Sequence, residues 1–188
     1  MNKITRKSII IISLCVLAAV YIARVSYINI VDGSTNIVQC KVGEKISENA
    51  YEYQVTKYFI LTEHEFEEKY DLDIPDDVFE NYSDEKILTV NMNISQIDCD
   101  DNSTYKFDLG NLFAQTTTYS QGVGLNLFSL INFDNTVLEK TGDKISVVLP
   151  YVFIKDVFSD LHWNNFKENS LKISFSNAED SKKEIILQ

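Results

Sequence analysis

One uncharged apolar run near the start of the chain constrains the fold more than any other feature. Residues 8–23 carry no charged side chain, and Lys3, Arg6 and Lys7 precede them. At 1.5 Å per residue this run makes about 24 Å of helix, and the apolar residues after Arg24 extend it towards the roughly 30 Å of a bilayer core. Because cations gather on the cytoplasmic side of a membrane span, we expect a single-pass anchor with its N-terminus in the cytoplasm.

Two other interpretations of this run compete with an uncleaved anchor. A cleaved signal peptide has a shorter apolar region that ends in small residues, and the nearest match, Val16-Leu17-Ala18, lies deep inside the run. A lipoprotein signal needs a small residue before its cysteine, whereas Leu14 precedes Cys15. The sequence therefore favours the uncleaved anchor, in which Cys15 is a small apolar residue of the span.

The anchor divides the chain into four segments. Residues 1–7 form a basic cytoplasmic end, residues 8–28 the transmembrane anchor or uncleaved signal, and residues 29–36 a tether rich in turn-forming residues. Residues 37–188 then suit one extracytoplasmic domain, long enough to bury a sizeable core. We therefore expect the protein at the cell membrane, with its C-terminal domain outside the cytoplasm.

The predicted domain is strongly acidic. Residues 1–24 hold four cations and no acidic residue, so the net charge of −11 for the whole chain becomes −15 for residues 25–188. A surface of this charge repels nucleic acid and anionic lipid headgroups, which excludes both as partners of the domain. It favours a cationic partner, although solubility alone also explains such a charge.

Alternation of apolar and polar residues predicts that the domain is built from β-strands. The clearest case is residues 88–95, where apolar side chains at the even positions share one face and polar side chains share the other. This pattern is typical of an antiparallel sheet with one solvated face. Further strands are predicted over residues 38–42, 51–61, 105–109, 125–133, 145–151, 171–175 and 184–187.

Two short helices are expected between these strands. Thr62 and Glu65 form a capping-box pattern, which predicts a two-turn helix that ends near Tyr70 and buries Phe66. Ser159 is a candidate N-cap for a second helix, which carries the only tryptophan. The pattern predicts a mainly β protein: an immunoglobulin-like antiparallel β-sandwich with one or two short helical insertions, preceded by a single N-terminal transmembrane helix.

Cys40 and Cys99 are the candidate disulfide pair, because both follow the anchor and face a compartment that permits disulfides. The bond would close a loop of about 60 residues and contribute roughly 4 kcal/mol on the chain-entropy account. The faces of the predicted strands on which the two cysteines lie argue against the bond. Cys40 shares an apolar face with its neighbours, whereas Cys99 follows the polar face of its strand into a turn. The bonded and free-thiol forms both stay open.

Candidate metal ligands and catalytic groups have weak support. Residues 98–103 resemble the start of a calcium loop, but Ser103 replaces the glycine and Leu109 the bidentate glutamate, so a solvated turn is favoured. The aspartates of residues 71–77 are likewise interpreted as an exposed loop. Neither His64 nor His162 has supporting ligands or a nucleophile at a useful spacing. We therefore predict no catalytic, metal-binding or cofactor-binding residue and no cofactor.

The order of elements also resembles a known family. The features that carry the resemblance are the basic start and anchor, residues 51–55 before a Glu-rich helix, the alternating 87–94 strand, Leu149-Pro150-Tyr151 before the tryptophan helix, and the closing 171–175 strand. This arrangement is similar to an uncharacterised family, a domain of unknown function, of small membrane-anchored extracytoplasmic bacterial proteins with an immunoglobulin-like sandwich. The resemblance implies no activity and transfers no functional residue.

The leading functional hypothesis is a non-enzymatic binding or accessory module, held at the membrane, with a protein partner at the cell surface. One rival is an envelope-associated hydrolase of unrecognised type, since paired carboxylates are recognised in space and not in sequence. A second rival is an immunity protein or transporter accessory subunit, in which the membrane helix itself contacts the transporter.

Overall fold

Two units make up the structure, a computed structural model that describes residues 14–26, 36–75, 84–97, 108–132, 142–168, 170–176 and 181–188. The chain divides into Met1–Asn36 and Ile37–Gln188, and the described part of the first unit is a helix over residues 14–26. The predicted anchor at residues 8–28 extends beyond this helix at both ends, into residues that are not described. Within the described ranges, no helix combines the length and apolar character that a membrane crossing requires.

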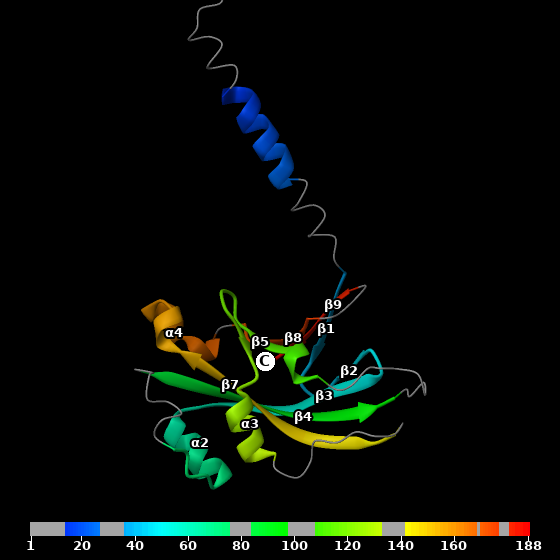
Figure 1. The fold of residues 1–188 in the computed structure, drawn as a ribbon, viewed down its shortest axis with the longest axis vertical. Helices are drawn as coiled ribbons and strands as arrows, with labels where there is room; N and C mark the ends of the chain where they lie inside the picture. Colours follow the sequence, from blue (N-terminus) through cyan, green and yellow to red (C-terminus); the bar gives the residue numbers. More distant parts are fainter. Residues whose placement is uncertain are drawn as a thin grey trace, which may run out of the picture. The chain divides into compact units, whose positions relative to one another are not determined.

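The second unit is a sandwich of two β-sheets (Figure 1). Sheet A has the strand order β1-β9-β8-β5-β6, and sheet B has the order β2-β3-β4-β7. The strands are β1 (Asn36–Lys41), β2 (Lys45–Glu48), β3 (Tyr51–Leu61), β4 (Glu85–Gln96), β5 (Leu112–Gln115), β6 (Ser120–Gly122), β7 (Lys144–Ile154), β8 (Lys172–Phe175) and β9 (Ser181–Ile186). The prediction of a mainly β sandwich is therefore confirmed.

Apolar side chains from both sheets meet between the two layers and form the main core. Val90 and Leu149 from sheet B and Ile173 from sheet A are fully buried there. Lys172 and Ser174 of β8 and Glu184 of β9 alternate with the buried core residues of these strands and lie on the outer face of sheet A. At one edge, Lys183 of β9 pairs with Glu48 of β2 at 2.6 Å and links the two sheets.

A β-bulge changes which side chains of β3 face the core. The pairing of β3 with β4 shifts register between Val55 and Lys57. An extra residue reverses the alternation that follows it, because successive side chains point to opposite faces. Tyr58 and Ile60 therefore pack against the main core, whereas Leu61 joins a second cluster on the outer face of sheet B. The sequence pattern alone gives no sign of this reversal.

Helix α2 (Glu63–Tyr70) covers one end of the outer face of sheet B (Figure 1). Its predicted capping box is confirmed, with the Thr62 hydroxyl accepting from Glu65 N at 3.3 Å and Glu65 Oε2 accepting from Thr62 N at 2.8 Å. Phe66 is fully buried against Ile87 of β4. The expectation that the second face of β4 is solvated is therefore wrong at this end, where a helix covers it.

The strand predicted over residues 125–133 does not form over its described residues, 125–132. Leu125–Ile131 form helix α3, which begins after Gly124 and also packs on the outer side of sheet B. Leu127 and Ile131, one turn apart, belong to the same cluster as Phe66. A short, mostly apolar segment fits a strand and a buried helix equally well. Here the packing of α3 against the rest of the domain stabilises the helix.

Helix α4 (Asp160–Asn164) lies on the connection from β7 of sheet B to β8 of sheet A, as predicted. The Ser159 hydroxyl caps it by accepting from His162 N. Trp163 is buried, its indole N–H donates to Asp84 Oδ2 at 2.8 Å, and Lys86 Nζ lies 4.2 Å from its ring. Helix α4 ends at Asn164, and a 3-10 turn, η4 (Phe166–Glu168), follows it.

The remaining elements were not anticipated. Residues 105–107 of a predicted strand lie outside the described residues, and Leu109 begins a 3-10 turn, η2 (Leu109–Asn111). A further 3-10 turn, η3 (Lys155–Val157), follows β7. Strands β2, β5 and β6 have three or four residues each, too few for a clear alternation.

Candidate functional site

An open groove crosses the outer face of sheet A. Its volume is about 770 Å³, and it spans four neighbouring strands through Gln39 of β1, Glu184 of β9, Lys172 of β8 and Gln115 of β5. Residues 116–120, which lead from β5 into β6, line it as well. The other lining residues are Ser170, Lys182, Ile186 and Gln188.

Glu184 is the centre of the charged network in this groove. Its carboxylate accepts hydrogen bonds from Lys172 Nζ at 2.6 Å and Gln39 Nε2 at 3.0 Å, and it pairs with Lys182 Nζ at 3.0 Å. Only 1% of the Glu184 side chain is exposed, whereas 26% of Lys172 and 41% of Lys182 are. Two ammonium groups thus lie on the solvent side of one buried carboxylate.

Hydrogen bonding decides the charge state of Glu184. Burial by itself raises the pKa of this carboxyl, but the hydrogen bonds from Lys172, Gln39 and Lys182 outweigh it and lower the pKa from 4.5 to about 2. The carboxylate is therefore ionised at neutral pH and holds both lysines at the groove.

The loop between β5 and β6 is fixed by its own hydrogen bonds. The Thr116 hydroxyl accepts from Thr118 N at 3.3 Å and Tyr119 N at 3.0 Å, and it donates to Tyr119 O at 3.2 Å. The Tyr119 ring packs edge-on against Phe158, with centroids 5.6 Å apart. This side of the groove is therefore preorganised, which lowers the entropic cost of binding.

Gln115 also lines the groove, and a hydrogen bond from Ser174 orients its side chain. Ser174 Oγ donates to Gln115 Oε1 at 2.8 Å. This bond leaves the Gln115 Nε2 donors without a partner among the residues that the structure describes. Gln115 also lies directly opposite Lys172 in the β5–β8 pairing, so the two side chains are neighbours on the same face.

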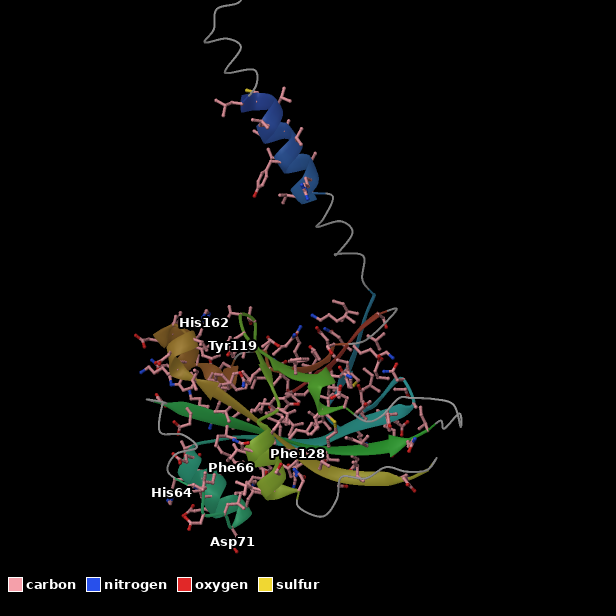
Figure 2. The ribbon with its side chains drawn as sticks, viewed as in Figure 1. His64, Phe66, Asp71, Tyr119, Phe128 and His162 are labelled. Atoms are coloured by element: carbon pink, nitrogen blue, oxygen red, sulfur yellow. The ribbon has the colours of Figure 1, made fainter. Side chains whose placement is uncertain are left out.

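The structure does not bring together the histidines considered in the sequence. His64 is exposed on α2 and lies 3.5 Å from Glu68, whereas His162 is exposed on α4 with Nδ1 3.1 Å from Ser159 Oγ. Figure 2 shows the two residues at well-separated places on the domain. Both take part in the local contacts of short helices.

The acidic loops and the cysteines are only partly described. Asp71 ends α2 in the left-handed conformation, with φ 52°, and Figure 2 places it at the far end of that helix. Asp76, Asp77 and the calcium-like residues 98–103 lie outside the described residues. Cys40 is buried and Cys99 lies outside the described residues, so the Cys40–Cys99 bond stays a prediction. In the described parts of the chain, no three metal-ligating side chains gather.

The residues of the groove were missed by sequence reasoning. Lys172 and Ser174 alternate with buried Ile173, and Lys182 and Glu184 precede buried Ile185, so their outward orientation was readable from the pattern. Their proximity to Gln39 and Gln115 was not readable, because it depends on the order of strands in the sheet. A strand order cannot be deduced from local periodicity.

The fold and the groove define a two-sheet β-sandwich with a polar site on one outer face. The chain belongs to the family described as Domain of unknown function (DUF5028), which matches residues 37–178. This match covers the described sandwich up to β8, and it confirms the part of the resemblance that concerns a domain of unknown function.

Two solved structures resemble the chain. One is an uncharacterized beta-sandwich protein from Clostridium difficile 630, at 12% identity and a TM-score of 0.45, covering 82% of this chain and 97% of that one. The other is a functionally unknown protein from Listeria monocytogenes EGD-e, at 10% identity and a TM-score of 0.43, covering 76% of this chain and 79% of that one. No curated protein matches the chain.

Proposed function

We propose that the chain is a membrane-anchored, extracytoplasmic binding module with an immunoglobulin-like sandwich, which takes a partner at the cell surface through the groove of sheet A. The observation that carries the proposal is the groove itself. It is about 770 Å³ in volume, it rests on four hydrogen-bonded strands, and the Thr116 turn fixes one side of it. Sites on rigid strands with preorganised loops favour recognition.

The state of the groove carboxylate supports binding over catalysis. A general acid or base works best with a pKa near the operating pH. Glu184 is the one side-chain carboxylate among the described lining residues, and its pKa of about 2 leaves it ionised and engaged by two lysines. His64 and His162 lie outside the groove lining. The groove therefore favours a non-enzymatic role.

The composition of the first unit supports the membrane anchor. The large apolar side chains of helix 14–26 are exposed, which is costly in water and favourable in lipid. A helix over the whole predicted segment, residues 8–28, would be roughly 32 Å long and would match a bilayer core. The cations ahead of it would keep the N-terminus in the cytoplasm.

Crosslinked pull-down from whole cells tests the binding role. We compare the full-length chain with Thr117→Trp, which fills the groove from an exposed loop position, and with Glu68→Trp on exposed α2 as the matched control. We expect Thr117→Trp to lose a partner that the wild type and Glu68→Trp both retain. Equal recovery by all three, or no reproducible partner at all, would contradict the proposal.

Membrane fractionation tests the anchor independently. The full-length chain should stay in the membrane pellet after an alkaline carbonate wash, and protease added to intact cells should degrade residues 37–188. Recovery of the intact chain from the soluble fraction would refute the anchor. Replacing residues 8–28 with an unrelated span should preserve partner capture, and its loss would favour the transporter-subunit alternative.

A further inference from the structure

We infer that the groove of sheet A binds an oxyanion, a phosphate or carboxylate group carried by its ligand, at the solvent side of Lys172 and Lys182 beside Gln115. This inference rests on the proposed function, because it names the chemistry that the same groove recognises. It goes further in predicting which side chains make the contact and which probes they bind.

The local charge of the groove favours an anion. Lys172 and Lys182 both approach Oε1 of Glu184, at 2.6 and 3.0 Å, and these three are the charged side chains among the described lining residues. Among the lining side chains, two ammonium groups lie beside one carboxylate, so these side chains together carry a net charge of +1. The carboxylate lies beneath the lysines with 1% exposure, so an anion that enters from solvent meets the ammonium groups first.

The groove also supplies hydrogen-bond donors that an oxyanion can use. An ammonium group has three N–H donors, and each lysine uses its interaction with Glu184 for only one of them. Gln115 Nε2 adds two donors that have no partner among the described residues, next to Lys172 across the β5–β8 pairing. A cluster rich in donors is complementary to a group that only accepts, and charge-assisted hydrogen bonds to such groups are the strong ones.

The acidic remainder of the domain does not prevent an anion from binding in the groove. Residues 25–188 carry a net charge of −15, which repels anions at long range. At physiological ionic strength exposed charges are screened over about 8 Å, so the two ammonium groups dominate inside the groove. A positive site on an acidic body also selects for anions that fit the groove and against bulk polyanions such as nucleic acid.

Titration with small anions tests the inference. The full-length chain in detergent micelles, labelled with ¹⁵N, is titrated with inorganic phosphate and separately with acetate, at ionic strength held constant with sodium chloride. The signals to follow are the amides of residues 116–120 and the Gln115 side chain. The variants are Lys182→Gln, Lys182→Glu and Lys172→Gln, with Lys57→Gln, an exposed lysine of β3 in the other sheet, as the control.

We expect saturable shifts in the groove with at least one anion, and the tighter of the two identifies the group as phosphate or carboxylate. Lys182→Gln and Lys172→Gln should each weaken binding at least fivefold, Lys182→Glu should abolish it, and Lys57→Gln should stay within twofold. Absence of saturable shifts, or unchanged binding by the Lys182 variants, overturns the inference. If Thr117→Trp still abolishes partner capture in that case, the proposed function stands and only the ligand chemistry is wrong.

Discussion

The Asn132 side chain hydrogen-bonds to both backbone groups of Val148, as a neighbouring strand would. Val148 N donates to Asn132 Oδ1 at 2.8 Å, and Asn132 Nδ2 donates to Val148 O at 2.9 Å. Gly124 N donates to Pro150 O at 2.8 Å, two residues further along the same edge. The two ends of α3 thus cover part of the outer edge of β7, which sheet B leaves unpaired. Covered edges protect a sheet from pairing with another chain.

Asn132→Ala should destabilise the domain and increase its self-association. The substitution leaves Val148 N–H and C=O without partners at a partly buried edge, a loss of about 2 kcal/mol in the free energy of unfolding. Urea unfolding measures the stability, and sedimentation measures the association. Ser129→Ala, which removes an exposed hydroxyl from the same helix, is the control and should change neither by much. An unchanged midpoint for Asn132→Ala would contradict the edge-covering role.

Glu184→Gln should lower stability at neutral pH but not in strong acid. The folded-state pKa of about 2 lies below the ordinary value of 4.5, so the ionised carboxylate stabilises the fold above about pH 4.5, and this contribution is lost as the pH falls towards 2. The partly exposed lysines reduce the effect to about 2 kcal/mol. Unfolding of both forms from pH 7 down to pH 2.5 should show the stability difference shrinking. A difference that stays constant with pH would refute the assigned charge state.

Thr62→Ala should destabilise α2 by about 1 kcal/mol, because the hydroxyl satisfies a backbone N–H at the first turn. Thr62→Ser keeps the oxygen and should restore most of the loss. Amide hydrogen exchange over residues 63–70 measures the effect locally. Equal protection in the alanine and wild-type forms would show that packing of Phe66 alone holds the helix.

The single tryptophan provides a direct reporter for α4. Trp163 is 3% exposed and donates to Asp84, so its emission should be blue-shifted and protected from iodide quenching. Asp84→Ala removes the acceptor and should red-shift the emission while costing about 1–2 kcal/mol, with Asp84→Asn intermediate. Strong quenching of the wild-type protein would show that α4 does not pack against the core.

The sequence predicts elements best where one local rule decides them. The Thr62 capping box, the Ser159 cap and the even-numbered core residues of β4 depend on neighbours within a few positions, and the structure confirms all three. The strand predicted over residues 125–133 was wrong over its described part, because a short and mostly apolar segment fits both helix and strand. Contact with Phe66 and β7 selects the helix, and that contact is not local.

The candidate site was harder to predict than the fold. Gln39, Gln115, Lys172 and Glu184 come from four strands, and only the order β1-β9-β8-β5 makes them neighbours. The residues that drew notice in the sequence, His64 and His162, take part in helix-end contacts. Residues with familiar chemistry are easily seen in a sequence, whereas a site made of ordinary polar residues on a sheet face needs the topology.

Site-specific photo-crosslinking in living cells tests the central claim most directly. A photoreactive residue is placed at Thr117, in the loop beside the groove, or at Glu68 on exposed α2 of the opposite layer. If the groove of sheet A is the binding surface, light should produce a discrete covalent adduct from position 117 and none from position 68. An adduct from position 68 alone, or none from either, would show that the groove is not where this protein meets its partner.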